Sequence, residues 1–157
     1  MLSTKADRMS AELDGEFVVF LIGVRINRVW KIHKWLPIFK ARKKMLHELM
    51  AHPETGCVSH YQSGGIAILY WRTYEQLEYI ARNPDKERWP AWASFHEKLD
   101  RSRGDVGVWR EVYVIKPGQT EMVHGGTRAL GLSKVGHRVP RSGANAQSVE
   151  RVKTGVA

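Results

Sequence analysis

The sequence predicts an α+β domain of the ferredoxin-like class, with strands and helices in the order β-α-β-β-α-β. Three observations support this prediction. Long runs of β-branched and aromatic residues occur at 16–27 and 104–115, two shorter runs flank a Gly-Gly pair between them, and two segments with helical spacing of apolar residues separate these runs. We therefore expect an antiparallel four-stranded sheet with two helices on one face.

The first strand and the first helix are predicted from a change of hydrophobic period. Residues 16–27 read EFVVFLIGVRIN, a composition typical of a strand that is buried on both faces. In residues 29–52 the apolar side chains instead recur with the spacing of an amphipathic helix. Pro37 lacks an N–H and fits a first helical turn, so we expect the regular helix to begin near Leu36 and to end before Pro53.

A hairpin and a final strand complete the predicted sheet. Residues 57–63 and 66–72 flank Gly64 and Gly65, and a Gly-Gly pair accepts the positive φ angles of a tight hairpin turn. Residues 104–115 read GDVGVWREVYVI, in which valines alternate with other side chains as expected for a strand. These segments supply the second, third and fourth strands.

The second helix is expected in two pieces. Thr73 followed by Gln76 forms a capping box, which predicts a helix that starts at Tyr74. The Asn-Pro-Asp sequence at 83–85 interrupts this helix, and Pro90 opens a further helical piece. Both pieces have an apolar face, so we expect them to pack on the sheet together.

The chain divides by composition into three parts. Residues 1–11 form a polar N-terminal extension, residues 12–117 hold the predicted domain, and residues 118–157 are rich in Gly, Ser, Thr and basic residues without a sustained period. We expect the third part to be a basic arm that packs on the domain near its start and is partly disordered towards its end.

The sheet face opposite the helices also needs to be covered. A second copy of the chain can cover it by packing sheet against sheet, which forms a dimeric α+β barrel and protects the strand edges. We therefore expect a homodimer in which each subunit binds a small-molecule substrate.

Composition narrows the class of protein. The single Cys57 permits no intrachain disulfide, and no apolar run is long enough to cross a membrane, so we expect a cytoplasmic location and no membrane partner. The net charge is +9, and eight basic residues with no acid lie between Arg25 and Lys44, a balance that can indicate nucleic-acid binding. A charge run is more typical of a solvated helix face, and no nucleic-acid-binding motif accompanies it, so a nucleic-acid partner is not favoured.

Four strings of the sequence together resemble a known family. They read GEFVVFLIGVRINRVWKIHKWLP, YWRTYEQLEYIARNP, PAWASFHEKL and GDVGVWREVYVI. Over about residues 12–132 the chain is similar to the monooxygenase-like family catalogued as DUF4188, which is grouped with dimeric α+β barrels such as haem-degrading monooxygenases and aldoxime dehydratases. The resemblance implies the same fold and an oxidoreductase of the monooxygenase type. Trp89 and Arg110 stand where family members often carry His, so chemistry that needs those histidines is not implied.

Candidate site residues are polar or aromatic side chains expected to point into a pocket between the sheet and the helices. His33 and His96 are candidate proton acceptors, because imidazole titrates near neutral pH, and Arg25 is a candidate for stabilising a substrate anion. Tryptophans are also common in cores and interfaces, and His33 lies between lysines as a surface residue does. The candidates for binding a small hydrophobic or aromatic substrate are Trp30, Tyr61, Trp71, Trp92 and Tyr113.

Three functions remain open at this stage. The first is a monooxygenase that needs no cofactor. In related dimeric barrels a helix near this point in the chain supplies an axial haem ligand, so the resemblance also implies a haem enzyme in which His96 binds the iron, with Trp71, Trp92 and Arg25 around the porphyrin. The third is a non-catalytic dimer that binds a ligand. No His or Cys spacing typical of a metal site is present, so no other metal is expected.

Overall fold

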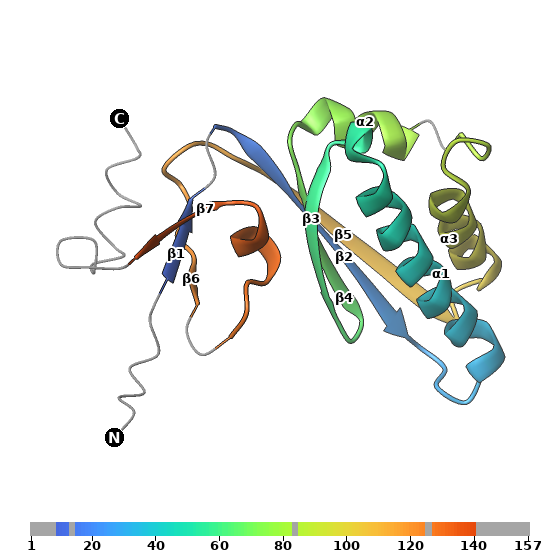
Figure 1. Cartoon of the computed structure of the whole chain (residues 1–157). Coiled ribbons are helices and arrows are strands. Elements are labelled where there is room, and N and C mark those ends of the chain that lie inside the picture. The colour runs from blue at the N-terminus through green and yellow to red at the C-terminus, as the bar shows by residue number, and fades with distance from the viewer. Residues whose placement is uncertain (1–8, 13–14, 83–84, 125–126, 141–157) are drawn as a thin grey trace, which may run out of the picture.

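The computed structural model describes residues 9–12, 15–82, 85–124 and 127–140 of the chain. Its main sheet has four antiparallel strands in the order β3-β4-β2-β5, and three helices lie on one face of this sheet (Figure 1). The predicted α+β fold is therefore confirmed. In chain order these elements are β2 (Phe17–Ile26), α1 (Ile32–Ala51), the short 3-10 helix η1 (Pro53–Thr55), β3 (Cys57–Ser63), β4 (Ile66–Trp71), α2 (Tyr74–Arg82), α3 (Pro90–Arg101) and β5 (Val106–Ile115).

A second, three-stranded sheet brings together segments from near both ends of the described chain. β1 (Met9–Glu12) pairs antiparallel with β6 (Val123–His124) and with β7 (His137–Pro140). Between β6 and β7 a 3-10 helix, η2 (Gly131–Lys134), contacts β3 and β4. Part of the predicted arm therefore packs on the main sheet, whereas its end, which was expected to be partly disordered, includes residues 141–157, which lie outside the described residues.

Helix α1 begins at Ile32 and not near Leu36, so the predicted start was wrong. The backbone N–H of Lys34 donates to the carbonyl of Lys31 at 2.9 Å, which closes a turn before Pro37 is reached. Pro37 then lies inside the helix. Its missing N–H removes a single backbone hydrogen bond near the helix start, and the packed apolar face of the helix compensates for this loss.

The other predicted element boundaries agree closely with the structure. The hairpin turns at Gly64, which has a φ of +53°. α2 starts as predicted, and the N–H of Gln76 donates to Thr73 Oγ1 at 3.2 Å, but the Gln76 side chain accepts from the Thr73 hydroxyl at 3.4 Å and not from its backbone N–H, so half of the capping box is formed. α3 begins at Pro90. The predicted break at 83–85 falls mostly on residues outside the described part of the chain.

The hydrophobic core lies between the sheet and the helices. Alternate side chains of β2 and β4 point towards α1 and α3, and the side chains of this layer are almost completely buried. Trp71, Trp92 and Phe95 are the largest of them. Its members include Val18, Phe20, Ile22, Met45, Leu49, Leu69, Trp71, Trp92, Phe95 and Leu99.

The chain itself covers part of the opposite face of the sheet. Ser59 Oγ, on β3, donates to the carbonyl of Gly131 at 2.9 Å, and both residues are buried. A Cβ at Gly131 would lie 3.0 Å from the hydroxyl of Tyr70, and the φ of Gly131 is +55°, so glycine permits this close approach. η2 therefore occupies a place on the sheet that was expected to be covered by a second subunit.

β5 forms one edge of the main sheet and is largely uncovered. Its register with β2 places Val108, Val112 and Val114 on the side of the helices and Trp109 and Tyr113 on the other side. All five side chains are exposed. Both faces of this edge strand thus present apolar or aromatic groups to solvent.

Candidate active site

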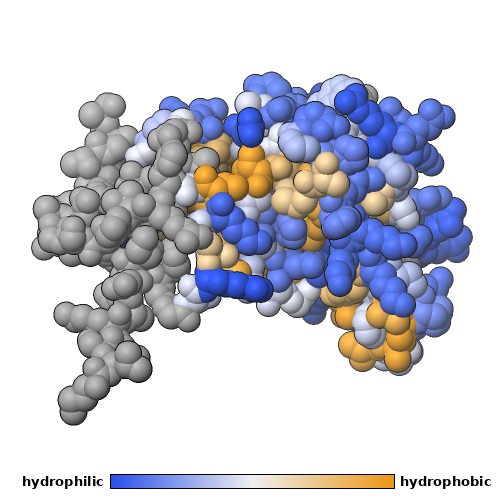
Figure 2. All heavy atoms as spheres, viewed as in Figure 1, coloured by the Kyte–Doolittle hydropathy of each residue, from blue (hydrophilic) through white to orange (hydrophobic). Residues whose placement is uncertain are grey.

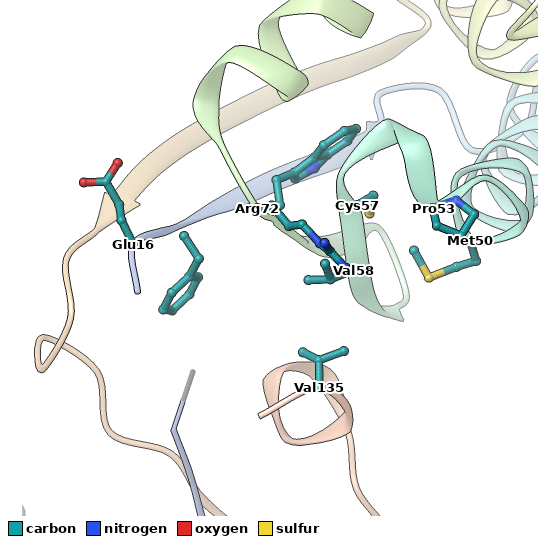
Figure 3. A pocket seen from close by; sticks show the side chains of 9 residues that line it. Glu16, Met50, Pro53, Cys57, Val58, Arg72 and Val135 are labelled. Carbon is teal, nitrogen blue, oxygen red and sulfur yellow. The ribbon is translucent and has the colours of Figure 1, made fainter. Parts of the chain in front are cut away.

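A pocket of about 600 Å³ lies at the end of the main sheet where β2 and β3 begin and β4 ends (Figure 3). The end of α1 and η1 form one wall, with Met50 and Pro53, and Val135 faces them from the segment that follows η2. Phe17 and Val58 add further apolar surface. A pocket of this size and composition suits a small molecule that has both an apolar skeleton and polar groups.

Two charged side chains line this pocket. Arg72 directly follows β4, and Glu16 directly precedes β2, so the antiparallel pairing of these strands brings both residues to the same end of the sheet. The backbone N–H of Arg72 donates to the carbonyl of Gly56 at 2.9 Å, which holds the end of β4 beside η1. Both side chains are exposed at this end, so a cation and a carboxylate are available to a bound molecule.

Trp71, which also lines this pocket, carries a buried hydrogen-bond donor. The side chain is fully buried, yet its indole Nε1 has no hydrogen-bond partner among the described residues. Leaving a buried donor unpaired costs about 1–3 kcal/mol. The donor thus lies in the wall of the pocket, shielded from solvent by the residues around it.

Cys57 lines the pocket as an unreactive thiol. Burial raises the pKa of Cys57 to about 12, although the backbone carbonyl of Ser59, which accepts a hydrogen bond from the thiol at 3.7 Å, lowers it slightly. The thiol therefore stays protonated at neutral pH, and a protonated thiol is a poor nucleophile. The side chain acts as apolar surface.

The structure brings together two of the predicted site residues, His96 and Trp92, on α3. Their ring centroids are 4.8 Å apart, and the His96 ring also meets the edge of Phe95 at 5.2 Å. The Trp92 carbonyl accepts a hydrogen bond from His96 Nδ1 at 2.9 Å, so Nδ1 carries the proton and Nε2 the lone pair. Burial lowers the pKa of His96, and Arg110 lowers it further.

These surroundings do not fit haem. A porphyrin needs an open face beside its axial ligand, but the His96 ring is packed between aromatic core side chains and does not line the 600 Å³ pocket. Trp92 and Trp71, which were expected to lie against the porphyrin, are buried members of the core cluster. We therefore derive no step through haem.

The remaining predicted site residues lie elsewhere. Arg25, Tyr61 and Tyr113 are exposed on the sheet face opposite the helices, and the hydroxyl of Tyr113 donates to the carboxylate of Glu111. Trp30 and His33 are exposed at the start of α1, at the end of the sheet distant from the 600 Å³ pocket. Their roles in catalysis or substrate binding stay predictions.

The sequence reasoning missed most of the residues that line this pocket. Of the predicted substrate-binding residues, Trp71 is the one that lines it. Glu16 and Arg72 carried a usable signal, because a charge directly before one strand and another directly after its antiparallel neighbour must lie at the same sheet end. Val135 carried no such signal, since the apolar residues of its segment do not recur with a regular period.

Two further properties concern the described part of the chain as a whole. Within it, no group of three or more His, Cys, Asp or Glu side chains is placed to hold a metal ion. None of its helices combines the length and the hydropathy that a membrane-crossing segment requires.

Comparison with known proteins identifies the family. No curated protein matches the chain significantly. The family described as monooxygenase af470-like matches residues 17–132, a range that begins with β2 and extends into η2. It includes the pocket residues Phe17, Trp71 and Arg72 and confirms the monooxygenase-like family predicted from the sequence. Since the match covers most of the 157 residues, the chain belongs to the monooxygenase af470-like family.

Proposed function

We propose that the chain is an oxidoreductase of the monooxygenase type that binds a small hydrophobic or aromatic substrate in the 600 Å³ pocket. The observation that carries this proposal is a pocket lined by apolar side chains together with the Arg72 side chain and with Trp71, whose indole N–H is unpaired. Apolar walls favour an aromatic skeleton, and the two donors favour an oxygen atom that becomes negatively charged.

The pocket suits a reaction in which the substrate supplies its own electrons. An activated CH₂ group of a phenolic or enolisable molecule loses a proton, and the resulting anion transfers electrons to O₂. One atom of O₂ becomes the oxygen of a new C=O group, and the other combines with the two hydrogens of the CH₂ group and leaves as water. Arg72 stabilises the anion in this scheme, and the indole N–H of Trp71 donates to its oxygen.

Glu16 is the proton acceptor in this proposal. Of the residues described as lining the pocket, it is the one with a carboxylate, and the Cys57 thiol stays protonated. Neither His33 nor His96 lines the pocket.

Oxygen uptake with a panel of quinols and polyketide-like phenols tests the proposed function. Arg72→Gln should lower kcat/KM by about tenfold or more, since it removes the charge that stabilises the anion but keeps a side chain of similar length. Arg128→Gln is the matched control, because Arg128 is also exposed but lies outside the pocket, and it should leave the rate unchanged.

The panel also distinguishes the non-catalytic alternative. Binding of phenols that depends on Arg72, without oxygen uptake by any of them, would indicate a ligand-binding protein and would refute the enzymatic proposal. An equal loss of rate in Arg72→Gln and Arg128→Gln would place the reaction outside this pocket.

We further propose that the chain forms a homodimer through β5. This edge strand is ten residues long and exposes Val108, Val112 and Val114 on one face and Trp109 on the other. Uncovered apolar edge strands tend to pair with another chain. Light scattering should give about twice the chain mass of 18.0 kDa, and Val112→Lys should return it to the mass of one chain. A single-chain mass for the unmodified protein would refute the dimer.

A further inference from the structure

A second pocket, of about 430 Å³, lies at the opposite end of the main sheet from the proposed substrate pocket. It is formed by the connection from β2 to α1, the first turn of α1, and the turn from α3 to β5. Two other residues that line it are Ser102 and Asp105. Its basic residues, from all three segments, are Arg28, Lys31, Lys34, Arg101 and Arg103.

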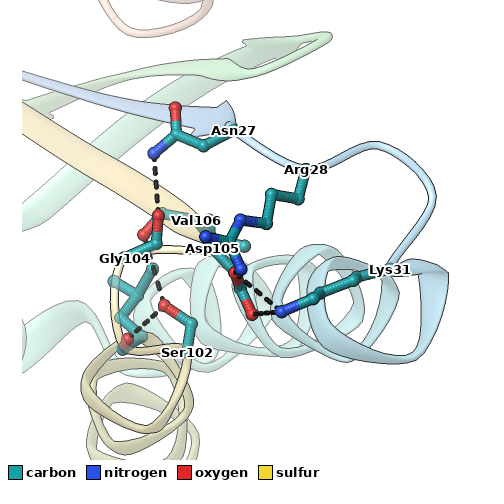
Figure 4. Close-up of polar contacts among 8 residues, drawn as sticks. Asn27, Arg28, Lys31, Ser102, Gly104, Asp105 and Val106 are labelled. Atoms are coloured by element: carbon teal, nitrogen blue, oxygen red, sulfur yellow. Dashed lines mark hydrogen bonds and ion pairs between the residues drawn. The ribbon is translucent and has the colours of Figure 1, made fainter.

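Asp105 balances only part of this positive charge. Its buried carboxylate accepts hydrogen bonds from Lys31 Nζ at 2.9 and 3.1 Å and lies 3.3 Å from Arg28 Nη1 (Figure 4). Hydrogen bonding from Lys31 is the main reason that the pKa of Asp105 is lowered, so this residue remains ionised. Arg101 pairs with Glu97 at 2.6 Å.

Two cations of the pocket have no hydrogen-bonded partner among the described residues, although Lys34 also lowers the pKa of Asp105 through its charge. Lys34 and Arg103 have neither a hydrogen bond nor an ion pair from their side chains to any other described residue. They come from different segments, α1 and the α3–β5 turn, and both side chains line the same hollow. A negatively charged group placed there would meet at once two cations that hold no hydrogen bond.

The start of α1 adds to the positive potential. A helix N-terminus carries a partial positive charge and favours acidic residues, but the first turn of α1 contains none, and Lys31 occupies the N-cap without a side-chain capping bond. Lys34 lies in this first turn. The local electrostatics are therefore unfavourable until an anion enters the pocket.

The turn that carries Arg103 is held in place by hydrogen bonds. Ser102 Oγ donates to the carbonyls of Leu99 at 2.7 Å and Val106 at 3.2 Å, and Asn27 Nδ2 donates to the carbonyl of Gly104 at 2.9 Å (Figure 4). Because the backbone of this turn is already fixed, only the Arg103 side chain has to be ordered when an anion binds.

We propose that this second pocket binds a phosphoryl group. A tetrahedral dianion can accept from an ammonium and a guanidinium of different segments, such as Lys34 and Arg103, and it suits an excess of several cations over one carboxylate. Asp105 in the wall disfavours close contact with a continuous nucleic-acid backbone.

The phosphoryl group can come from a soluble molecule or from a lipid headgroup. Beside the pocket, the start of α1 exposes Val29, Trp30 and Ile32, which are 64%, 72% and 54% exposed, and Figure 2 shows hydrophobic residues at this end of the molecule. Exposed apolar residues next to basic ones are typical of contact with an anionic membrane surface. The source is therefore decided by whether Trp30 contributes to binding.

Calorimetric titration with inorganic pyrophosphate tests the soluble source. The double variant Lys34→Gln/Arg103→Gln should weaken binding by about tenfold or more, because it removes two charge-assisted hydrogen bonds. The matched control is Lys43→Gln/Lys86→Gln, which removes the same net charge from exposed positions outside the pocket. Circular dichroism melting checks that both double variants fold.

Sedimentation with phosphatidylcholine vesicles, with and without phosphatidylglycerol, tests the lipid source. Binding to the anionic vesicles that is lost in Lys34→Gln/Arg103→Gln and also in Trp30→Ser supports the proposal with a lipid headgroup. Pyrophosphate binding that Trp30→Ser leaves unchanged supports it with a soluble ligand.

Three results would overturn the proposal. The first is equal weakening in the pocket variant and in the control variant, which would show a general charge effect. The second is no binding of pyrophosphate or of anionic vesicles by the unmodified protein. The third is retention of a DNA duplex that depends on Lys34 and Arg103 without any response to the other two probes, which would indicate nucleic acid.

Discussion

Replacing Trp71 by Phe should separate the indole N–H from the other contributions of this side chain. The unpaired buried donor costs about 1–3 kcal/mol, and Phe removes it. The smaller ring leaves a void on the order of 40 Å³, which at ~24 cal/mol per Å³ costs about 1 kcal/mol. Because the two effects oppose each other, the free energy of unfolding should stay within about 2 kcal/mol of the unmodified protein.

Substrate binding should respond differently from stability. If the indole N–H donates to the bound substrate, its loss removes about 1 kcal/mol, which raises Kd roughly fivefold. Trp89 provides a matched control, because it is also buried with an unpaired Nε1 but lines a different pocket, between η1 and α2. Trp89→Phe should change stability to a similar extent and leave Kd unchanged.

Two measurements on the same three proteins check this prediction. Urea unfolding followed by circular dichroism gives the free energy of unfolding, and calorimetric titration with the tightest-binding phenol of the panel gives Kd. An unchanged Kd in Trp71→Phe would refute the proposed role of the N–H. An equal rise of Kd in both variants would show that binding responds to general loosening of the core.

Three further outcomes are expected. Cys57 should react slowly with thiol-alkylating reagents at pH 8 in the folded protein and quickly in urea. Because its pKa is raised in the folded state, the stability that the protonated thiol contributes should be lost as the pH rises from about 9 towards 12, which unfolding measured at several pH values can show. The Soret band of added haem should be the same with the unmodified protein and with His96→Ala, since the His96 ring is packed against core aromatics. A Soret shift that depends on His96 would contradict the conclusion that this site does not fit haem. Arg103→Gly should raise the free energy of unfolding by about 0.5–1 kcal/mol, because a non-glycine residue at a φ of +49° is strained, while it weakens pyrophosphate binding. A loss of stability in Arg103→Gly would show instead that the Arg103 side chain supports the turn.

The secondary structure and strand pairing followed largely from local sequence. Strands and helices are distinguished by the period of their apolar residues, and that period does not depend on distant parts of the chain. The Gly64 turn specifies the β3–β4 hairpin, and Thr73 with Gln76 specifies the start of α2. The start of α1 was misplaced because one proline can be accommodated within a helix whose apolar face is packed.

The positions of both pockets depended on contacts between residues far apart in the chain. Asp105 meets Lys31 across 74 positions, and Ser59 meets the Gly131 carbonyl across 72 positions. No local period records such contacts, because they arise when the packed layers bring distant turns together. Packing also decided that Trp92 belongs to the helix–sheet layer with the His96 ring against it, whereas Trp71 shares that layer and also lines a pocket. The identities of these side chains were readable from the sequence, but whether each one faces the core, solvent or a cavity was decided by the tertiary structure, because burial depends on which surfaces the fold brings into contact.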